Sequence, residues 1–277
     1  MGGLRQLLSA VILLACLSQL SSAAQPQRIA SLNMCLDQLL VMLVPKAHIA
    51  SVTYLSAHPQ LSTISDQLDG LNINHGLAEE LVPLAPDLIL AGEFGAIEAV
   101  ALLESLGYRV ERLTMPYTIN DISTHIRAFG ELVGAAQAAT EMAREIEQQL
   151  AEVDAEQADA PHNTTAIWYS SDGVVIGGGT LEHELLIRAG YRNLAAEHNY
   201  TGFTKLDLEQ LLVLAPQVIV VDVGYAQAFS LADEYLQHPA LAAKSRILKL
   251  PAALSVCSAP VIADALRALK NGVEEIQ

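Results

Sequence analysis

Short apolar segments alternate with amphipathic ones along the first half of the chain. Four segments are apolar enough for buried strands, at residues 28–33, 48–55, 87–92 and 109–115. Between them, residues 35–44 and 96–107 carry apolar side chains three and four positions apart, as helices do, and end at Pro45 and Gly107. Strands that alternate with helices in this way predict βαβ units and a mostly parallel sheet.

The second half of the chain repeats this order. Strands are predicted at residues 165–171, 217–224 and 246–251, a hairpin return at 174–179, and helices at 180–190 and 260–272. Three glycines at 177–179 precede the first of these helices. They lack the lysine and the spacing of a phosphate-binding loop, so we expect a tight turn or a close approach of the backbone to a ligand.

The two halves also share a sequence. One copy, EELVPLAPDLILAGE, starts at Glu79, and the other, EQLLVLAPQVIVVDV, starts at Glu209. In both, a glutamate opens a leucine-rich helical turn, an Ala-Pro pair ends it, and an apolar strand follows. The repeat predicts two similar Rossmann-like α/β lobes, in which ligands bind at loops beyond the carboxyl ends of the strands.

A long segment at residues 119–158 separates the two halves. Its apolar residues recur at spacings of three and four, at Ile122, Ile126, Phe129, Val133, Met142, Ile146, Leu150 and Val153. One interpretation is one or two amphipathic helices that pack on a lobe. The other is a long connector helix of about 50 Å that joins the lobes, with Gly134 as a weak point. The predicted domains are therefore an N-terminal lobe at 25–118, the connector at 119–158 and a C-terminal lobe at 159–277.

The first 24 residues have the features of an export signal. Arg5 precedes the apolar run LLSAVILLACLSQL, and Ser22 and Ala24 occupy the −3 and −1 positions of a cleavage before Gln25. The run is too short for a membrane span. The alternative is a lipoprotein in which Cys16 becomes the acylated N-terminus, but the apolar run continues past Cys16.

The net charge limits the kinds of partner that the protein can bind, and the cysteine content raises the question of a disulfide. The formal net charge is −16, whereas a nucleic-acid partner would require a basic surface. Cleavage before Gln25 leaves Cys35 and Cys257, an even number in an oxidising compartment. Three interpretations stay open for this pair: a disulfide between the lobes, two free buried thiols, or thiolate contacts to a bound metal.

Five segments, in this order, resemble the substrate-binding proteins of ABC importers, specifically the iron-complex and vitamin B12 class. The segments are RIASLNMCLDQLL, His58-Pro59, AEELVPLAPDLIL, LEQLLVLAPQVIV and CSAPVIADALRAL. Together they cover nearly the whole mature chain. The resemblance implies a monomeric periplasmic receptor, without a cofactor, that captures a metal chelate and delivers it to an inner-membrane permease dimer. The chelate would be a corrinoid such as cobalamin, a ferric siderophore or haem.

The resemblance also implies a role for the repeated glutamates. In that class a glutamate of each lobe docks onto arginines of the permease, and Glu79 and Glu209 occupy this place, each seven residues before a proline. Charges of this kind chiefly set register and association rate. The alternative is that each glutamate only favours the start of its helix through the helix dipole. Glu80 adjoins Glu79, but the second copy has Gln210 there, which favours Glu79.

The predicted ligand site lies at the strand-end loops, where a protein with few aromatic residues places many of them. The candidates in the N-terminal lobe are Asn33, Met34, Cys35, Tyr54, His75, Phe94 and Tyr117. Those in the C-terminal lobe are Tyr169, Gly178, Tyr200, Phe203, Tyr225 and Cys257. The alternative is that several of these residues only cap the core, and Trp168, inside a predicted strand, is open to both interpretations.

Eight histidines are scattered without paired ligand spacing, so no metal site is predicted. His75 is either a contact to a metal chelate or a polar residue on the rim. The scarcity of arginine and lysine near the loops slightly favours a corrinoid over a strongly anionic siderophore. The alternative function is a periplasmic enzyme that modifies metal chelates, but no catalytic arrangement stands out at recognisable spacing.

Overall fold

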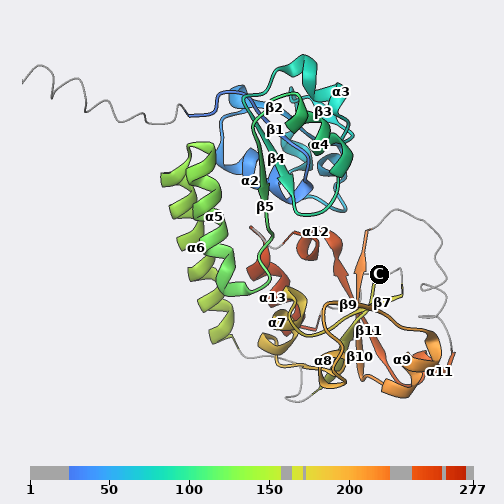
Figure 1. Cartoon of the computed structure of the whole chain (residues 1–277). Coiled ribbons are helices and arrows are strands. Elements are labelled where there is room, and N and C mark those ends of the chain that lie inside the picture. Colours follow the sequence, from blue (N-terminus) through green and yellow to red (C-terminus); the bar gives the residue numbers. More distant parts are fainter. Residues whose placement is uncertain (1–24, 157–163, 171–172, 225–238, 258–259, 273–277) are drawn as a thin grey trace, which may run out of the picture.

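The structure, a computed structural model, describes residues 25–156, 164–170, 173–224, 239–257 and 260–272. The expected export signal at 1–24, Cys16 and Tyr225 lie outside these ranges. Figure 1 shows two α/β lobes, one above the other, with two helices running along one side of both. None of the helices in the described ranges is long and apolar enough to cross a membrane.

The N-terminal lobe is built on a five-stranded parallel sheet of order β3-β2-β1-β4-β5. Its strands are β1 (Ile29–Ser31), β2 (Ile49–Thr53), β3 (Ile73–Asn74), β4 (Leu88–Gly92) and β5 (Val110–Leu113). Its α-helices are α2 (Met34–Leu43), α3 (Ala78–Leu81) and α4 (Ile97–Ser105). Strands β1, β2 and β4 are buried along their whole length, because helices cover both faces of a parallel sheet.

The C-terminal lobe has a four-stranded parallel sheet of order β11-β10-β6-β8 and a separate antiparallel pair, β7-β9. Its strands are β6 (Thr165–Trp168), β7 (Val174–Ile176), β8 (Arg192–Asn193), β9 (Phe203–Lys205), β10 (Val218–Val223) and β11 (Arg246–Pro251). Its helices are α7 (Leu181–Arg188), α8 (Leu194–Glu197), α9 (Leu208–Leu214), α11 (Pro239–Ala242), α12 (Ala252–Ser255) and α13 (Ile262–Lys270). The prediction of two α/β lobes with mostly parallel sheets is confirmed.

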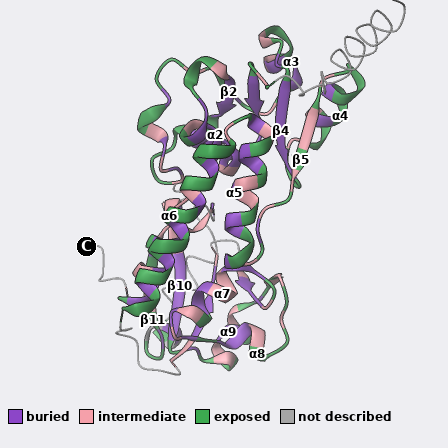
Figure 2. Cartoon of the chain, turned by 90° about the vertical axis from the view of Figure 1, so that its left-hand side faces the viewer, coloured by how far each residue is buried: buried purple, intermediate pink, exposed green. Residues whose placement is uncertain are grey.

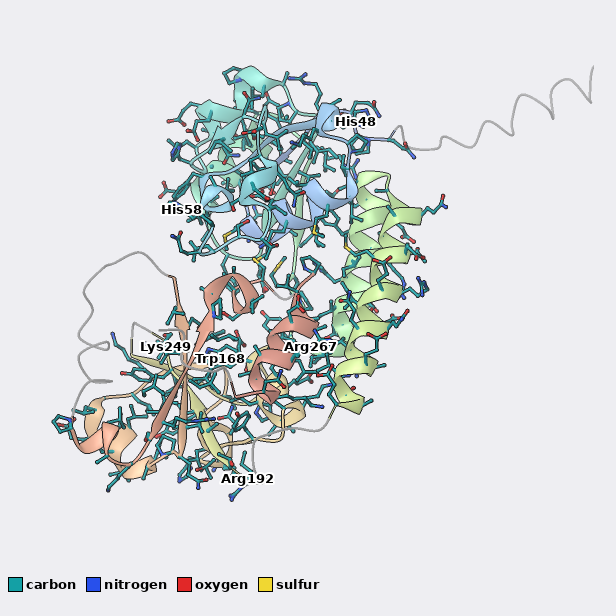
Figure 3. All side chains as sticks on the ribbon, turned by 180° about the vertical axis from the view of Figure 1, so that it is seen from behind. His48, His58, Trp168, Arg192, Lys249 and Arg267 are labelled. Carbon is teal, nitrogen blue, oxygen red and sulfur yellow. A yellow bond between two sulfur atoms is a disulfide. The ribbon has the colours of Figure 1, made fainter. Side chains whose placement is uncertain are left out.

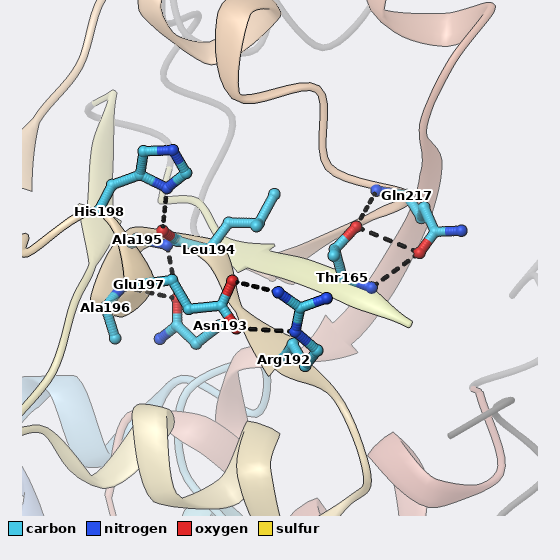
Figure 4. Close-up of polar contacts among 9 residues, drawn as sticks. All are labelled: Thr165, Arg192, Asn193, Leu194, Ala195, Ala196, Glu197, His198 and Gln217. Atoms are coloured by element: carbon cyan, nitrogen blue, oxygen red, sulfur yellow. Dashed lines mark hydrogen bonds and ion pairs between the residues drawn. The ribbon is translucent and has the colours of Figure 1, made fainter. Parts of the chain in front are cut away.

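Local polar contacts fix the outer edge of this second sheet (Figure 4). The Asn193 side chain caps α8 by accepting hydrogen bonds from the backbone N–H groups of Ala195 and Ala196. Arg192 pairs with Glu197 at 2.7 Å across that helix start. At the other side of β6, Gln217 Oε1 accepts a hydrogen bond of 2.9 Å from the backbone N–H of Thr165. The first two contacts fix the start of α8 directly after β8, and the third joins the start of β6 to the residue before β10.

The repeated sequence has the same backbone conformation in both lobes. Ala85 ends the first helical turn in the left-handed region at φ 44° and ψ 57°, and Ala215 ends the second at φ 46° and ψ 55°. A left-handed conformation is uncommon for a residue other than glycine. The following residues, Pro86 and Pro216, cannot continue a helix. Each turn therefore delivers the chain directly into the buried strand that follows, β4 or β10.

The connector between the lobes is a helical hairpin, so the expectation of one long connector helix is wrong. Helix α5 spans Ile119–Val133 and α6 spans Ala136–Ala155. Gly134 ends α5 in the left-handed region at φ 77°, and the N–H of Ala135 bonds to the carbonyl of Gly130 at 2.7 Å. This glycine-ended cap reverses the chain, because a left-handed residue stops the helix and glycine adopts it without strain.

The buried stripe of the hairpin joins the cores of both lobes. Ile122, Ile126 and Phe129 of α5 and Ile146 and Val153 of α6 are buried, as the sequence pattern predicts. They belong to one continuous apolar cluster that includes residues of α2 and β1 in the N-terminal lobe and of α7 and α13 in the C-terminal lobe. Figure 2 shows the two helices side by side, with exposed residues on their outer faces. The lobes are therefore packed against a common support.

A disulfide between Cys35 and Cys257 forms a second tie between the lobes, with the two Cα atoms 5.1 Å apart. Cys35 lies in the first turn of α2, and Cys257 follows α12. The two residues are 222 positions apart in sequence. Since each lobe contributes one cysteine, the bond holds the lobes together at a place separate from the hairpin.

The close packing of the hairpin gives a stability prediction at Gly130. A Cβ atom at this position would lie 2.1 Å from the Cβ of Ala139 on α6. Alanine favours a helix over glycine by about 1 kcal/mol, but here the overlap forces the helices apart. We expect Gly130→Ala to lower the free energy of unfolding by about 1–3 kcal/mol, measured by denaturant unfolding.

Glu131→Ala is the matched control, since Glu131 is the next residue and is exposed. It should change the free energy of unfolding by only a few tenths of a kcal/mol, or about 0.5 at most. An unchanged or increased stability for Gly130→Ala would contradict the packing described here.

Candidate functional site

A cavity of about 220 Å³ lies between the two lobes, and both lobes contribute to its wall. Its thirteen lining residues are Asn33, Cys35, Glu93, Phe94, Met115, Pro116, Tyr117, Thr180, Leu181, Glu182, Phe203, Ser255 and Val256. We call this the inter-lobe cavity. Figure 3 shows the molecule from behind, with the disulfide sulfurs between the lobes. Larger hollows lie elsewhere, beside the hairpin turn and beside α3 and α4.

The inter-lobe cavity is the strongest candidate because it lies at the carboxyl ends of the parallel strands. Asn33 follows β1, Glu93 follows β4, and Met115 follows β5. Ser255 lies on α12, directly after β11. In open α/β sheets this is the edge where ligands bind. The larger hollows do not have this relation to the strands of both lobes.

An exposed phenylalanine from each lobe lines the cavity. Phe94 follows β4 and is 74% exposed, and Phe203 begins β9 and is 66% exposed. Single exposed apolar side chains are ordinary on a protein surface, but an apolar patch that lines a cavity is typical of a binding site. Tyr117 and Pro116 add to the apolar surface on the N-terminal side. The arrangement suits a flat or apolar surface of a ligand held between the lobes.

Close packing at two glycines shapes the loops of the cavity. A Cβ at Gly92 would lie 2.5 Å from Nδ2 of Asn33, whose Oδ1 accepts hydrogen bonds from the N–H groups of Cys35 and Leu36. A Cβ at Gly177 would lie 2.2 Å from the carbonyl oxygen of Tyr200. The close approach expected of the glycine loop is therefore made to the protein's own backbone.

Two half-buried acidic residues, Asp222 and Glu182, lie at the C-terminal side of the cavity. Asp222 accepts hydrogen bonds from Trp168 Nε1 at 3.0 Å and from Ser255 Oγ at 2.6 Å. Burial raises the pKa of Asp222, although these two bonds oppose the shift. Glu182 lines the cavity and is partly accessible from it, but protein atoms surround most of its side chain. Burial raises the pKa of Glu182 to about 7, and the charge of Asp222 adds to the shift.

On the opposite wall, Tyr117 donates a hydrogen bond of 3.1 Å to Glu93 Oε2. This bond to the carboxylate raises the pKa of the Tyr117 hydroxyl, because ionising the phenol would lose the bond and place two negative charges together. Both residues follow strand ends of the N-terminal lobe. The phenol proton is thus already committed to the protein.

The cavity brings together five of the residues that the sequence predicted for the ligand site: Asn33, Cys35, Phe94, Tyr117 and Phe203. Met34, Tyr169 and Cys257 are buried, with Tyr169 in the core of the C-terminal lobe. Gly178 and Tyr200 bond to each other through the backbone, at 2.9 Å from N–H to carbonyl. These five are not part of the cavity wall. Tyr225 lies outside the described residues.

Tyr54 and His75 lie together on the N-terminal lobe and do not line the cavity. Their rings stack with centroids 5.1 Å apart, and His58 meets the Tyr54 ring edge-on at 6.1 Å. His75 Nδ1 lies 2.9 Å from Glu80 Oε1, and the His75 backbone N–H donates to Glu80 Oε2 at 2.7 Å. His75 is therefore held by the start of α3. Among the described residues, no group of three or more histidine, cysteine or acidic side chains is placed to hold a metal ion.

The same geometry separates Glu79 from Glu80. Glu80 binds the backbone at the start of α3, and its equivalent Gln210 accepts a hydrogen bond of 3.0 Å from the N–H of Asp207 at the start of α9. Both are capping residues. Glu79 and Glu209 are exposed, one on each lobe, and neither side chain forms a hydrogen bond or an ion pair with another described residue.

Eight residues of the wall were not predicted from the sequence: Glu93, Met115, Pro116, Thr180, Leu181, Glu182, Ser255 and Val256. Two signals were available. Thr180 is a helix N-cap, whose Oγ1 accepts a hydrogen bond of 3.1 Å from His183 N–H, directly after the glycine loop. Ser255 and Val256 directly precede Cys257, which was itself a candidate.

The raised pKa of Glu182 gives a stability prediction. In the unfolded chain this carboxyl loses its proton near pH 4.5, and in the folded chain near pH 7. As pH rises between these values the unfolded state releases the proton first, so the native state loses stability. We expect Glu182→Gln to raise the melting temperature relative to the parent protein at pH 8 by more than it does at pH 4.5.

Glu131→Gln serves as the control, since it removes an exposed carboxylate of α5. Its effect on the melting temperature should be similar at both pH values. A Glu182→Gln effect that does not grow between pH 4.5 and pH 8 would contradict the buried position of this carboxyl.

Comparison with known proteins places the chain in a family. The sequence profile of the family described as periplasmic binding protein matches residues 29–251. No curated protein matches the chain in sequence.

Solved structures share its fold. A periplasmic haem-binding protein of Pseudomonas aeruginosa is 26% identical, with 88% of this chain and 91% of that chain covered and a TM-score of 0.70. A periplasmic haem-binding protein of Roseiflexus sp. RS-1 is 20% identical, with 90% of this chain and 99% of that chain covered and a TM-score of 0.74. A periplasmic vitamin B12-binding protein of Vibrio cholerae is 19% identical, with 90% of this chain and 96% of that chain covered and a TM-score of 0.65. With a family match over most of its length and two lobes of the matching fold, the chain belongs to the periplasmic binding protein family.

Proposed function

We propose that the protein captures a metal chelate in the inter-lobe cavity and delivers it to an ABC permease of the inner membrane. The observation that carries this proposal is a cavity at the strand ends of both lobes with one exposed phenylalanine from each, Phe94 and Phe203. Structural neighbours bind haem, vitamin B12 or iron by their descriptions. Corrinoids, haem and ferric siderophores are therefore the candidate ligands.

The size of the cavity limits how such a ligand sits. Pockets for small molecules commonly measure about 300–1,000 Å³, and the inter-lobe cavity measures about 220 Å³. The hairpin and the disulfide both join the lobes, so a wide opening is not available. We infer that one edge of the chelate enters the cavity, while the rest of its face contacts Phe94 and Phe203 near the mouth.

The remaining parts of the proposal follow from the sequence and the family. The export signal at 1–24 would be removed before Gln25, leaving a monomer in the periplasm without a lipid at Cys16. Glu79 and Glu209 are the proposed contacts to the permease dimer, since each is exposed and not engaged in capping. One acidic residue on each lobe matches a two-fold partner with a basic rim.

The alternative of a chelate-modifying enzyme has less support. The family and the structural neighbours are binding proteins. In the inter-lobe cavity the hydroxyl of Ser255 donates to Asp222, and Tyr117 donates to Glu93. Neither arrangement pairs a nucleophile with a free base.

Ligand binding is tested by fluorescence of Trp168, the single tryptophan of the chain, which is hydrogen-bonded to Asp222 behind the cavity. The purified mature protein is titrated with cyanocobalamin, cobinamide, haem and a panel of ferric siderophores. We expect saturable one-to-one quenching by one class. Phe94→Ala with Phe203→Ala should weaken that binding about tenfold or more.

Leu106→Ala is the matched control, since Leu106 is 56% exposed at the end of α4 and does not line the cavity. It should leave the affinity unchanged. The absence of binding by every compound in the panel would contradict the proposed function.

The permease contact is tested by uptake. Glu79→Ala with Glu209→Ala should reduce transport of the bound chelate to near background, because each lobe loses its charge, while the affinity of the purified protein for the chelate stays the same. Glu131→Ala with Glu145→Ala removes two exposed carboxylates of the helical hairpin and is the control. Normal uptake by the Glu79 and Glu209 double variant would contradict the docking role.

A further inference from the structure

Among the residues that the structure describes, the wall of the inter-lobe cavity carries negative charge and no positive charge. Glu93 and Glu182 belong to it, and Asp222 lies behind Ser255, whereas none of the thirteen lining residues is an arginine or a lysine. Carboxylate and phosphate groups of ligands are usually held by such basic side chains. An anionic ligand would therefore meet like charge in this cavity.

The segments outside the described ranges, apart from the expected export signal, contain no permanently charged basic residue that could offset this charge. Residues 157–163, 171–172, 225–238, 258–259 and 273–277 contain no arginine or lysine, and Arg5 lies in the expected export signal. Seven arginines of the described chain form ion pairs with acidic residues. Lys205 and Lys249, on β9 and β11, are exposed and are not part of the cavity wall; Figure 3 labels Lys249.

The hydroxyl groups of the described wall already donate their hydrogen bonds to the protein, so the wall mainly offers acceptors to a ligand. The hydroxyl of Ser255 donates to Asp222 Oδ1 at 2.6 Å, that of Thr180 to the carbonyl of Gly177 at 2.9 Å, and that of Tyr117 to Glu93 at 3.1 Å. The hydroxyl protons of the wall are thus committed to the protein. Among the described lining residues, the Nδ2 group of Asn33 is the remaining side-chain donor, while the carboxylates of Glu93 and Glu182 accept.

The N-terminus of helix α7 lies at the cavity, but it does not make the cavity favourable for an anionic group. A helix N-terminus attracts anions through its free N–H groups. Here the chain supplies the anion itself, because the Glu182 carboxylate bonds to its own backbone N–H, and Thr180 Oγ1 accepts from the N–H of His183. Little positive potential remains for the acid group of a ligand.

Resting on the proposed function, we propose that this cavity selects an uncharged or cationic chelate whose edge carries amide or amine N–H groups, and that Glu182 is the residue that makes the selection. An N–H group of the ligand would donate to the Glu182 carboxylate from inside the cavity, with the macrocycle between Phe94 and Phe203. Glu93 provides a second acceptor at the opposite wall.

This chemistry separates the candidate ligands. The edge of a corrinoid carries several neutral amide groups, which donate hydrogen bonds. Haem presents two carboxylates at its edge, and carboxylate or catecholate ferric siderophores are anionic as complexes. A buried carboxylate without a basic partner disfavours the second and third groups, because burying like charges together is costly. Among corrinoids, haem and anionic ferric siderophores, the inferred ligand class is therefore the corrinoid.

The test compares cobinamide with haem at pH 8, where Glu182 is mostly charged. Binding to the purified mature protein is followed by Trp168 fluorescence and by calorimetry. We expect cobinamide to bind the parent protein at least about tenfold more tightly than haem. Glu182→Gln keeps the shape and removes the charge, and should weaken cobinamide binding about tenfold. Glu182→Lys should abolish cobinamide binding and strengthen haem binding.

Glu131→Gln is the charge-matched control and should leave both affinities unchanged. The melting temperature of each variant is measured in parallel, so a fold change in affinity counts only for a folded protein, and Glu182→Gln provides a near-isosteric variant if Glu182→Lys does not fold. Tighter binding of haem than of cobinamide by the parent protein, or unchanged cobinamide affinity in Glu182→Gln, overturns the inference while leaving the proposed function intact. No binding of either compound, or of any other in the panel, overturns both.

Discussion

The apolar stripe shared by α5 and α6 is the contact on which the rest of the structure depends. It packs against α2 of one lobe and against α7 and α13 of the other, so one continuous apolar cluster runs from each lobe into the hairpin. Close-packed interiors resist small displacements, and here that resistance fixes the position of one lobe relative to the other. The inter-lobe cavity exists at its observed size because this support holds its two walls at a set distance.

The repeated unit assigns two different tasks to two adjacent residues. In both lobes the third residue of the short helix, Glu80 or Gln210, binds the backbone at the helix start. The residue before it, Glu79 or Glu209, points away from these contacts and is exposed. The left-handed alanines at 85 and 215 then end both helices in the same way. Duplication has preserved a complete local structure, including its one unusual backbone conformation, and with it two acidic positions on separate lobes.

Local patterns predicted the parallel sheets, because apolar runs, Ala-Pro pairs and helix-ending glycines act within a few residues. They did not resolve the hairpin, since the apolar spacing continues on both sides of Gly134 and only the left-handed glycine reverses the chain. The sequence places Tyr169 near the end of a strand and predicts a ligand contact, but the structure buries it in the core of the C-terminal lobe. Glu182 and Ser255 both line the cavity, but only tertiary packing brings them to it, so their place could not be predicted from local sequence. The distance between Cys35 and Cys257 depends on that packing too, so their pairing could not be decided from spacing.

The inter-lobe disulfide has a consequence for how the protein is made. Cys35 is synthesised early and Cys257 almost last, because 222 positions separate them. The bond can therefore close only after nearly the whole chain has been made. Under the proposed cleavage before Gln25, residues 1–24 are removed together with Cys16, the only other cysteine of the chain. Oxidation of the mature protein then has a single possible intramolecular product, and errors in pairing within one molecule cannot occur.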